Sequence, residues 1–443
     1  MNQEAPANDR QPGSAAGPQL VAAIGAELDT LLAAADTDLA QRYPGGDGAR
    51  QPVHTVYVPA QTLGDAETAD PAAEWGAAAW ELLEQHGGDT GRLAEVVGLE
   101  PQMLDQVLEP VRRKLLEEPV EDLRIDFEDG YGVRGDPTED GDTAKAARIL
   151  RRLAGSPSGP FSYGVRVKCL EAPLRARSLR TLTTLLATLS SDGALPPGLV
   201  TTLPKVTSVD QVSAFVTALT RLESGLDLPA ESLKFEIQVE TPQAILNADG
   251  TATVARMVHA AAGRCTGLHY GTYDYSAGIG IPASQQRLDH PAADHAKQVM
   301  QLAAAGTGVR LSDGSTNVMP VGDRDQVHAA WRLHSSLVRR ALDRGYYQGW
   351  DMHPGHLVTR YLATYAFFRE ALPSAARRLR IYLDGADSGI VDEPATAQAL
   401  SSAILRGVDC GAISADEATG EVGSDLATLA ALARRPAPPA SGA

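Results

Sequence analysis

Short apolar runs alternate with longer amphipathic stretches along most of the chain. The runs are apolar or β-branched enough for strands buried on both faces of a sheet, and they occupy residues 54–58, 123–127, 163–170, 199–206, 233–239, 265–270, 308–311 and 347–352. Between several runs, apolar residues recur at helical spacing, at residues 143–153, 174–189, 208–222 and 325–342. Strands that alternate with helices imply right-handed parallel crossovers, and eight such units close into a barrel. The pattern therefore predicts an α/β fold, a (β/α)8 TIM barrel.

Further helical patterns lie outside these units. Leu20, Ile24 and Leu28 predict a leading helix over residues 19–43. Other helices are expected at residues 77–87, 93–116, 361–380, 395–405 and 425–434. Both ends of the chain are rich in Pro and in small or polar residues, so we expect them to be mobile. The expected parts are a flexible tail and leading helix (1–50), a catalytic barrel with a helical insertion near 60–120 (51–360), and a C-terminal helical arm with a flexible tail (361–443).

Composition narrows the function classes. The chain of 443 residues carries a formal charge of −17, which disfavours nucleic acid because a polyanion needs clustered Lys and Arg. The cysteines at 169, 265 and 410 show no paired spacing, so neither a disulfide framework nor a zinc site is expected. The sequence begins without a basic or apolar leader, and no run approaches the ~18 apolar residues of a membrane span. We therefore expect a cytoplasmic protein that binds neither nucleic acid nor membrane.

Acidic residues cluster where three of the predicted strands end. The second run ends in Asp126, Glu128 and Asp129, Glu240 follows the fifth run, and Asp274 follows the sixth. Because a barrel gathers these strand ends into one cup, the carboxylates could hold one divalent cation, and hard oxygen ligands suit Mg²⁺ better than Zn²⁺. The alternative is that the acids cap the helices that follow, with Glu240 as an ordinary acid at a helix start.

Three basic residues are expected near the same group of strand ends. Arg166 and Lys168 lie two apart in the third run, so their side chains are expected to face the same way. Two cations inside a barrel need anionic partners, and either a substrate carboxylate or the acids near Asp126 could supply them. Arg166 is favoured for the substrate because its guanidinium binds carboxylates in two places. Lys205 ends the fourth run and is expected beside the cup.

A histidine pair follows the eighth run. His353 and His356 are separated by Pro354 and Gly355, which indicate a turn more than a metal-binding helix. We therefore expect His353 and Pro354 to form a wall or lid of the substrate site.

Taken in order, these strand ends resemble the citrate lyase β-subunit-like family of the HpcH/HpaI aldolase group, which is built on a phosphoenolpyruvate/pyruvate-type TIM barrel. The resemblance covers residues 55–354 and is carried by Val56-Tyr-Val-Pro59, Asp126-Phe-Glu-Asp129, Val165-Arg166-Val, Leu203-Pro-Lys205-Val, Glu240-Thr-Pro-Gln-Ala-Ile, Gly271-Thr-Tyr-Asp274-Tyr and His353-Pro354. The stretch Ser388-Gly-Ile-Val-Asp392-Glu-Pro394 is similar to the C-terminal segment of the family, which in some members lends an Asp to a neighbouring subunit.

The resemblance implies a role for each of these residues. Glu240 and Asp274 would bind Mg²⁺, with Mn²⁺ as the alternative ion, and Arg166 would bind the substrate oxyanion. The acids from Asp126 to Asp129 would support the metal and the arginine, and Asp392 would act as an acid or base in trans. The family cleaves or forms carbon–carbon bonds next to a carbonyl, often on CoA thioesters. A homo-oligomer, a trimer or hexamer, is also implied.

The leading hypothesis is therefore a Mg²⁺-dependent lyase or aldolase that forms an enolate from a small hydroxy or oxo acid or its CoA thioester. Two alternatives remain open. One is an enzyme of the same fold that uses phosphoenolpyruvate or a phosphate ester. The other is a non-catalytic barrel that binds a metabolite, which predicts that Asp126, Glu240 and Asp274 do not converge.

Overall fold

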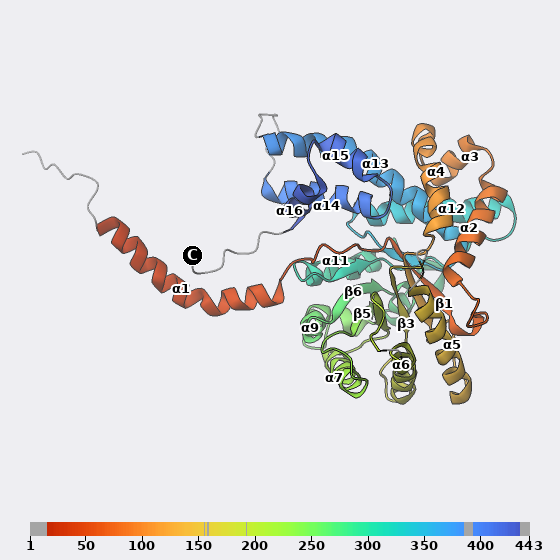
Figure 1. Ribbon diagram of the computed structural model, residues 1–443, viewed down its shortest axis with the longest axis horizontal. Coiled ribbons are helices and arrows are strands. Elements are labelled where there is room, and N and C mark those ends of the chain that lie inside the picture. The colour runs from red at the N-terminus through yellow and green to blue at the C-terminus, as the bar shows by residue number, and fades with distance from the viewer. Residues whose placement is uncertain (1–15, 155, 157–158, 192, 385–392, 435–443) are drawn as a thin grey trace, which may run out of the picture. The chain divides into compact units, whose positions relative to one another are not determined.

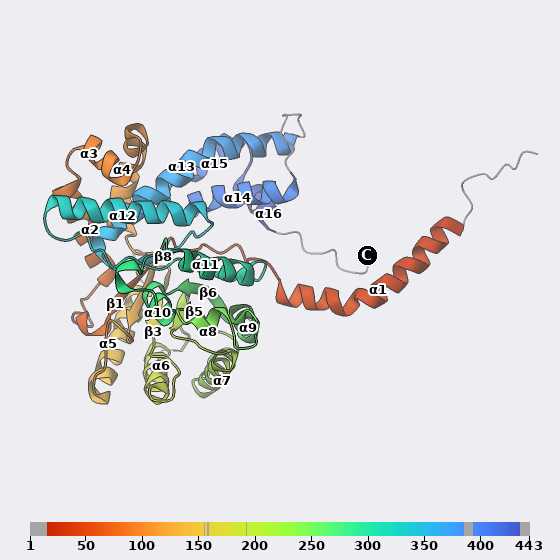
Figure 2. The same cartoon turned by 180° about the vertical axis from the view of Figure 1, so that it is seen from behind.

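The eight predicted strands all form, and they close into a parallel barrel (Figures 1 and 2). The strands are β1 (His54–Pro59), β2 (Asp122–Asp126), β3 (Ser162–Arg166), β4 (Leu199–Leu203), β5 (Lys234–Val239), β6 (Cys265–Tyr270), β7 (Arg310–Ser312) and β8 (Gly349–Asp351). They pair in the order β7-β6-β5-β4-β3-β2-β1-β8. The ring is completed by a bridge between Ser312 and Gln348 and by a 2.8 Å hydrogen bond from the Asp313 amide to the Gln348 carbonyl. The TIM-barrel prediction is confirmed.

The computed structural model describes residues 16–154, 156, 159–191, 193–384 and 393–434. The expected mobile ends, residues 1–15 and 435–443, and the segment that contains Asp392 lie outside these ranges. The chain divides into two units, Met1–Pro44 and Gly45–Ala443. No described helix is long and apolar enough to cross a membrane.

The first unit contains the predicted leading helix, α1 (Ala16–Arg42). Its leucines are largely exposed within the described chain, Leu20 at 62% and Leu31 at 69%.

The second unit contains the barrel and its helices. The helices of the insertion after β1 are α2 (Pro71–Gly87), α3 (Thr90–Val97) and α4 (Pro101–Glu117). The crossovers contain α5 (Asp136–Ala154), α6 (Arg175–Leu189), α7 (Val209–Gly225), α8 (Pro242–Ile245), α9 (Thr253–Ala260), α10 (Thr272–Gly278), α11 (Pro291–Ala304) and α12 (Arg324–Asp343), with short 3₁₀ turns η1 (Ala60–Thr62) and η2 (Ala283–Gln285). After β8 come α13 (Pro354–Asp384), α14 (Pro394–Asp409), α15 (Ala415–Val422) and α16 (Leu426–Ala433).

The insertion and the C-terminal helices pack together beside the barrel. The long helix α13 contacts α2 and α4 on one side and α14 and α15 on the other, and α3 contacts α12. In Figures 1 and 2 these helices gather on the opposite side of the sheet from α5, α6 and α7. Segments that are far apart in sequence therefore build one helical layer, with α13 at its centre.

Two predicted boundaries are wrong in a way that affects the site. The third and fourth strands end at Arg166 and Leu203 rather than at residues 170 and 206. Pro204 cannot donate to a strand ladder, which explains the end of β4. In addition, α5 begins at Asp136 instead of residue 143, since the polar segment after Gly135 forms its first turn.

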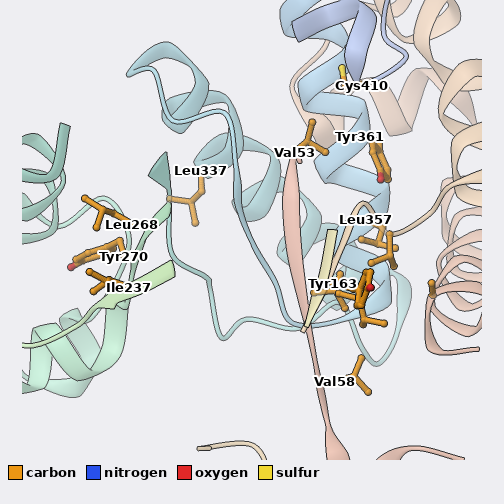
Figure 3. Packing of buried hydrophobic residues seen from close by; sticks show 14 of the residues in the cluster. Val53, Val58, Tyr163, Ile237, Leu268, Tyr270, Leu337, Leu357, Tyr361 and Cys410 are labelled. Carbon is orange, nitrogen blue, oxygen red and sulfur yellow. The ribbon is translucent and has the colours of Figure 1, made fainter. Parts of the chain in front are cut away.

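The apolar core lies between the barrel wall and the helices. Leu123, Ile125, Val165 and Phe235 are fully buried, and Figure 3 shows Ile237, Leu268 and other members of this cluster as sticks. Because side chains alternate across a strand, the residues between these apolar positions point into the barrel. In β2, β3 and β5 the periodicity thus separates an apolar outer face from an inner face that carries the polar residues.

The barrel interior contains a chain of charged groups rather than a plain apolar filling. The Arg124 guanidinium donates to both carboxylate oxygens of Glu236, at 3.2 and 3.1 Å, and also pairs with Asp122. His269 lies 2.9 Å from Glu236 and accepts a 3.2 Å hydrogen bond from the Trp350 indole. Arg124 on β2 reaches Glu236 on β5 across the interior, so this network ties opposite walls of the barrel together.

Replacing Arg124 with Met should lower the free energy of unfolding by about 3–5 kcal/mol, since Glu236 and Asp122 would keep their buried charges without the cation between them. Urea unfolding measures this difference. The matched control is Arg113→Met, which removes an exposed arginine of α4 and should change the free energy by less than about 0.5 kcal/mol. Equal effects of the two substitutions would contradict the role assigned to Arg124.

Candidate active site at the carboxyl end of the barrel

The predicted polar residues lie where consecutive strands end. Asp126 and Arg166 are the last residues of β2 and β3, and Glu240 directly follows β5. Lys205 comes two residues after β4, and Asp274 lies in the first turn of α10, after β6. All five therefore gather at the carboxyl ends of the strands, which is where TIM-barrel enzymes place their active sites.

Arg166 and Asp126 form a bidentate ion pair at the base of this region. The Nε and Nη2 atoms of Arg166 donate to the two oxygens of Asp126, each at 2.7 Å. The same carboxylate accepts from the backbone amides of Glu128 and Gly130 at 2.9 and 2.8 Å. A Cβ atom at Gly130 would lie 2.7 Å from Asp126, so a glycine is required here. Although burial opposes it, the Asp126 carboxylate raises the pKa of Arg166. The guanidinium is therefore permanently charged and fixed in orientation.

Aromatic rings and an amide complete the surroundings of Arg166. Its guanidinium carbon lies 4.8 Å from the centre of the Tyr57 ring and 5.6 Å from that of Trp350. Its Nη1 atom donates to Gln238 at 3.3 Å, and Gln238 in turn donates to Glu240. A guanidinium has five N–H donors, so Arg166 retains donors for a further oxygen beyond these contacts.

Lys205 sits among the carboxylates. Its ammonium lies 2.8 Å from Glu128, 2.8 Å from Asp129 and 3.3 Å from Asp274. Burial lowers the pKa of this ammonium, but the negative charges of Glu240 and Glu128 outweigh burial and raise it. Lys205 is therefore a fixed positive charge at the point where the strand-end acids meet.

The backbone of Lys205 is itself unusual. Its φ angle is +50°, in the left-handed region that residues with a side chain rarely adopt. This conformation lets the Lys205 backbone amide donate to Glu240 at 2.8 Å while the side chain reaches the acids. Such strain costs on the order of 1–2 kcal/mol and is typical of functional sites.

Glu240 is as deeply buried as Asp126 and more deeply than the other acids of the group. It is 2% exposed, and its two oxygens accept from the Lys205 amide and the Gln238 side chain. A Cβ atom at Gly271 would lie 2.3 Å from the Glu240 Cβ, so only glycine lets β6 approach this closely. Burial raises the pKa of Glu240 to about 8, and the negative charge of Asp274 adds to the effect. Glu240 is therefore poised to lose its proton when a cation arrives.

The acids outnumber the cations in this region. Two cations, Arg166 and Lys205, are surrounded by the carboxylates of Asp126, Glu128, Asp129, Glu240 and Asp274. Full ionisation would leave three negative charges uncompensated, and burial raises the pKa of Glu128 as well as that of Glu240. Carboxylate oxygens are the donors that Mg²⁺ prefers, so the chemistry of this set fits a divalent magnesium ion.

These acids are not packed as closely as metal ligands. Among the described residues, one group brings three ligand atoms within 4.8 Å of one another, and it consists of His334, Asp351 and His356. That group lies outside the barrel mouth, and its Asp351 is already paired with Arg360 at 3.0 Å and with His54 at 3.1 Å. At the mouth, the ammonium of Lys205 pairs with Glu128, Asp129 and Asp274, so a divalent ion bound by these acids would compete with it.

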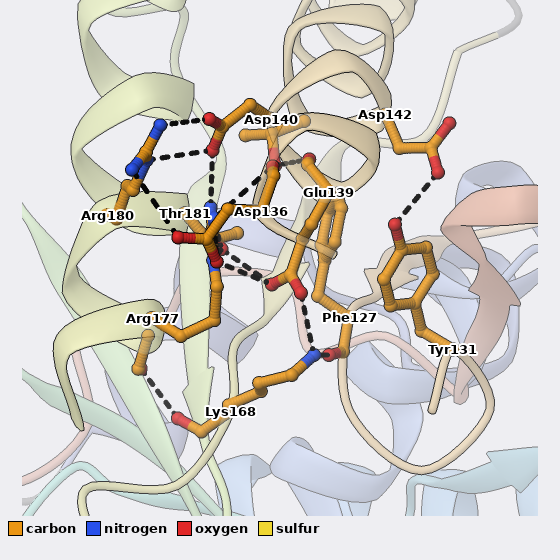
Figure 4. A network of polar contacts seen from close by, with 12 residues as sticks. Phe127, Tyr131, Asp136, Glu139, Asp140, Asp142, Lys168, Arg177, Arg180 and Thr181 are labelled. Atoms are coloured by element: carbon orange, nitrogen blue, oxygen red, sulfur yellow. Dashed lines mark hydrogen bonds and ion pairs between the residues drawn. The ribbon is translucent and has the colours of Figure 1, made fainter. Parts of the chain in front are cut away.

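Lys168 does not face the same region as Arg166. It lies beyond the end of β3, and its ammonium contacts the Phe127 carbonyl at 2.6 Å and the Glu139 carboxylate at 3.1 Å (Figure 4). It also contacts the Gly132 carbonyl at 3.3 Å. These contacts use its three N–H donors. The expectation that both side chains point the same way is wrong, because alternation ends with the strand. Lys168 instead links α5 to the segment after β2.

His353 and Pro354 lie at the start of α13. Pro354 is the first residue of the helix, and the half-buried His353 accepts a 3.1 Å hydrogen bond from the Gly355 amide. Burial lowers the pKa of His353, which favours a neutral ring. No hydrogen bond or ion pair within the described chain joins His353 to the acids around Lys205. Its role in binding substrate stays a prediction, as does that of Asp392.

The sequence interpretation missed the neutral residues that hold the charged ones. Gln238 bridges Arg166 and Glu240, while Tyr57 and Trp350 flank the guanidinium. Gln238 lies two residues before Glu240 on β5, so strand alternation could have placed it on the same face. Tyr57 and Trp350 gave no comparable signal, since aromatic residues in strands more often belong to an apolar core.

The family and structural comparisons agree with this fold. Residues 32–437 match the family described as "Domain of unknown function (DUF6986)", and no curated protein matches the sequence. A citrate lyase from Burkholderia xenovorans has a TM-score of 0.52 and 20% identity, covering 73% of this chain and 91% of that chain. At this identity the likeness shows a shared fold, which confirms at that level the resemblance inferred from the strand ends.

Two other solved structures are similar with lower TM-scores. Haloferax volcanii malate synthase in a magnesium/glyoxylate complex has a TM-score of 0.48 and 14% identity, covering 86% of this chain and 97% of that chain. CitE from Mycobacterium tuberculosis in complex with magnesium, acetoacetate and coenzyme A has a TM-score of 0.46 and 18% identity, covering 82% and 99%. TM-scores below 0.5 support no comparison of individual site residues.

Without Mg²⁺, the wild-type protein should lose stability relative to the Glu240→Gln variant as pH rises from about 5 to 8. The pKa of Glu240 is raised from 4.5 to about 8 in the folded chain. Across this window the folded state keeps a proton that the unfolded state has released, so the free energy of unfolding falls with rising pH. Urea unfolding in EDTA at several pH values measures the difference between the two proteins. Parallel curves would show that Glu240 ionises normally.

Proposed function

We propose that this chain, which belongs to the family described as "Domain of unknown function (DUF6986)", is a Mg²⁺-dependent carbon–carbon lyase or aldolase. Its substrate is a small hydroxy or oxo acid or the corresponding CoA thioester, and the reaction passes through an enolate. One observation carries this proposal. Four carboxylates meet around Lys205, next to a guanidinium that Asp126 holds in place. A non-catalytic barrel would not require these acids to converge.

The residues proposed to bind the Mg²⁺ ion are Glu240 and Asp274. Glu240 is buried and Asp274 is half exposed, with 45% of its side chain accessible, so one ligand is fixed by the barrel and the other faces the solvent and the substrate. Glu128 and Asp129, which share the Lys205 ammonium with Asp274, would hold water around the ion. When bound, Mg²⁺ supplies a Lewis acid that polarises a substrate carbonyl.

The residue proposed to bind the negatively charged oxygen of the substrate is Arg166. Its orientation is set by Asp126 before any substrate arrives, so little entropy is lost when its remaining N–H groups bind a carboxylate or an enolate oxygen. Tyr57 and Trp350 cover the guanidinium and reduce its contact with water, which strengthens each interaction that it makes. The proposed role of Arg166 is therefore to stabilise the negative charge that develops as the carbon–carbon bond breaks.

The reaction needs a proton acceptor as well. In the cleavage direction, a base removes the proton of the substrate hydroxyl and the carbon–carbon bond breaks. One fragment becomes a carbonyl compound, and the other leaves as an enolate that takes up a proton. Asp392 is the candidate base by resemblance to the family, acting on the site of a neighbouring subunit. This assignment implies a homo-oligomer.

Replacing Glu240 with Gln or Asp274 with Asn should lower metal-dependent kcat/KM by on the order of 100-fold or more, because each change removes a charged ligand of the ion. The activity is sought by incubating 2-oxo acids and acyl-CoA thioesters with Mg²⁺ and following pyruvate, glyoxylate or acetyl-CoA. Asp210→Asn, an exposed acid in the first turn of α7, is the matched control and should keep full activity. Full activity in either site variant would refute the assignment, and phosphate release would favour the phosphate-ester alternative.

Replacing Lys205 with Met should tighten Mg²⁺ binding by about 10-fold, because the ammonium competes with the ion for Glu128, Asp129 and Asp274. Isothermal titration calorimetry at pH 8 measures the dissociation constant directly. Lys234→Met, at the opposite end of the strands, removes the same charge and should leave the constant unchanged. Weaker binding in the Lys205 variant would show that the lysine supports the ion instead.

A further inference from the structure

An open cavity of about 640 Å³ lies at the other end of the barrel. Its lining comes from the segment before β1, from the loops that precede β7 and β8, and from helices α14 and α16 of the C-terminal arm. All these segments belong to the unit Gly45–Ala443. Cavities of roughly 300–1,000 Å³ are typical of sites for small molecules. This cavity is separate from the candidate active site, which lies at the carboxyl ends of the strands.

Three arginines line the cavity without carboxylate partners. Arg310, Arg406 and Arg434 form no ion pair with any acid in the part of the chain that the structure describes. Arg310 donates to the Ala49 carbonyl at 3.2 Å, and Arg406 donates to the Gln51 side chain at 2.7 Å. A guanidinium has five N–H donors, so both have donors left for another group.

Arg406 is the best positioned of the three. Its guanidinium carbon lies 4.4 Å from the centre of the Tyr347 ring, which fixes the plane of the group. Burial lowers the pKa of Arg406 and the positive charge of Arg310 adds to this effect, whereas Tyr347 and the Asp409 carboxylate raise it. Two arginines close enough to affect each other in a partly buried cavity favour binding of an anion between them.

The rest of the lining suits an organic molecule rather than a bare ion. Gly45, Gly48, Gly306 and Gly308 form part of the wall, and all have positive φ angles, so backbone lies at the cavity surface where side chains would otherwise fill the space. The polar residues Gln398 and Ser402 of α14 also line the cavity.

Two acids also line the cavity and limit what it can bind. Asp47 already accepts a 2.9 Å hydrogen bond from the Ala49 amide, and Asp409 ends α14. Because the lining has three arginines and two acids, it favours a ligand that carries its negative charge in one compact group. A ligand with negative charges along its whole length would meet the acids. The acids would accept hydrogen bonds from hydroxyl or amino groups elsewhere on the same ligand.

We propose that this cavity binds an organic phosphate of about nucleotide size. The phosphate lies between Arg310 and Arg406, and its hydroxyl-bearing part contacts α14. Arginine is suited to this task because its planar fork binds phosphate oxygens in pairs. The site does not depend on the proposed lyase activity, since none of its lining residues belongs to the acids around Lys205.

The test is isothermal titration calorimetry of the full chain with AMP, ADP and ribose 5-phosphate, in EDTA and at fixed ionic strength. Citrate is the control for an anion without phosphate. At least one phosphate should bind saturably to the wild-type protein. Arg406→Gln and Arg310→Gln should each weaken that binding by at least about 10-fold, and Ser402→Trp should abolish it by filling the cavity.

Two control variants establish whether phosphate binds in this cavity and nowhere else on the protein. Arg332→Gln removes an exposed arginine of α12 and should leave binding unchanged, and so should Asp274→Asn at the opposite end of the barrel. The proposal is overturned if none of the phosphates binds, if citrate binds as tightly, or if Arg310→Gln and Ser402→Trp retain wild-type affinity while remaining folded by circular dichroism. Because Asp274→Asn should lose turnover but keep phosphate binding, failure of the lyase assignment is distinguishable from failure of this one.

Discussion

The excess of carboxylates at the mouth of the barrel is the constraint on which the rest of the site depends. Parallel strands bring their ends together whatever residues they carry, and the acids that contact Lys205 follow three of them, β2, β5 and β6. The ammonium of Lys205 meets three of these acids, and the backbone amide of the same residue contacts Glu240. The left-handed backbone of Lys205 allows this amide contact. Burial raises the pKa of Glu240, and the negative charges of Asp274 and Glu128 add to the effect.

The charged interior of the barrel explains how such a site can be rigid. Below the mouth, Arg124 joins Glu236 and Asp122, and His269 joins Glu236 to Trp350. Each of these charges is satisfied by a partner within the network, so none of the side chains can rotate without leaving a buried charge unpaired. The ring centre of Trp350, which donates to His269, also lies 5.6 Å from the Arg166 guanidinium carbon. The network therefore extends to the residues that surround Arg166.

The fold could be read from the sequence because its strongest signals are local. Buried parallel strands are short apolar runs, and each is followed by a polar strand end, so both the barrel and the positions of Asp126, Arg166, Glu240 and Asp274 were predictable. The direction of Lys168 was not, since alternation applies only within a strand and β3 ends at Arg166. Its partner Glu139 lies on α5 (Figure 4), and that contact depends on how the helix packs.

The charged residues at the two ends of the barrel come from different kinds of element. The acids at the carboxyl end all follow strands, so their geometry is set by the closed sheet itself. At the other end, Arg310 begins β7, but Arg406 lies on α14, a helix of the C-terminal arm. Any anion held between them joins the arm to the barrel. The arm is already connected to the barrel through α13, which packs against α14 and begins shortly after β8, so an anion between Arg310 and Arg406 would add a second link between the two.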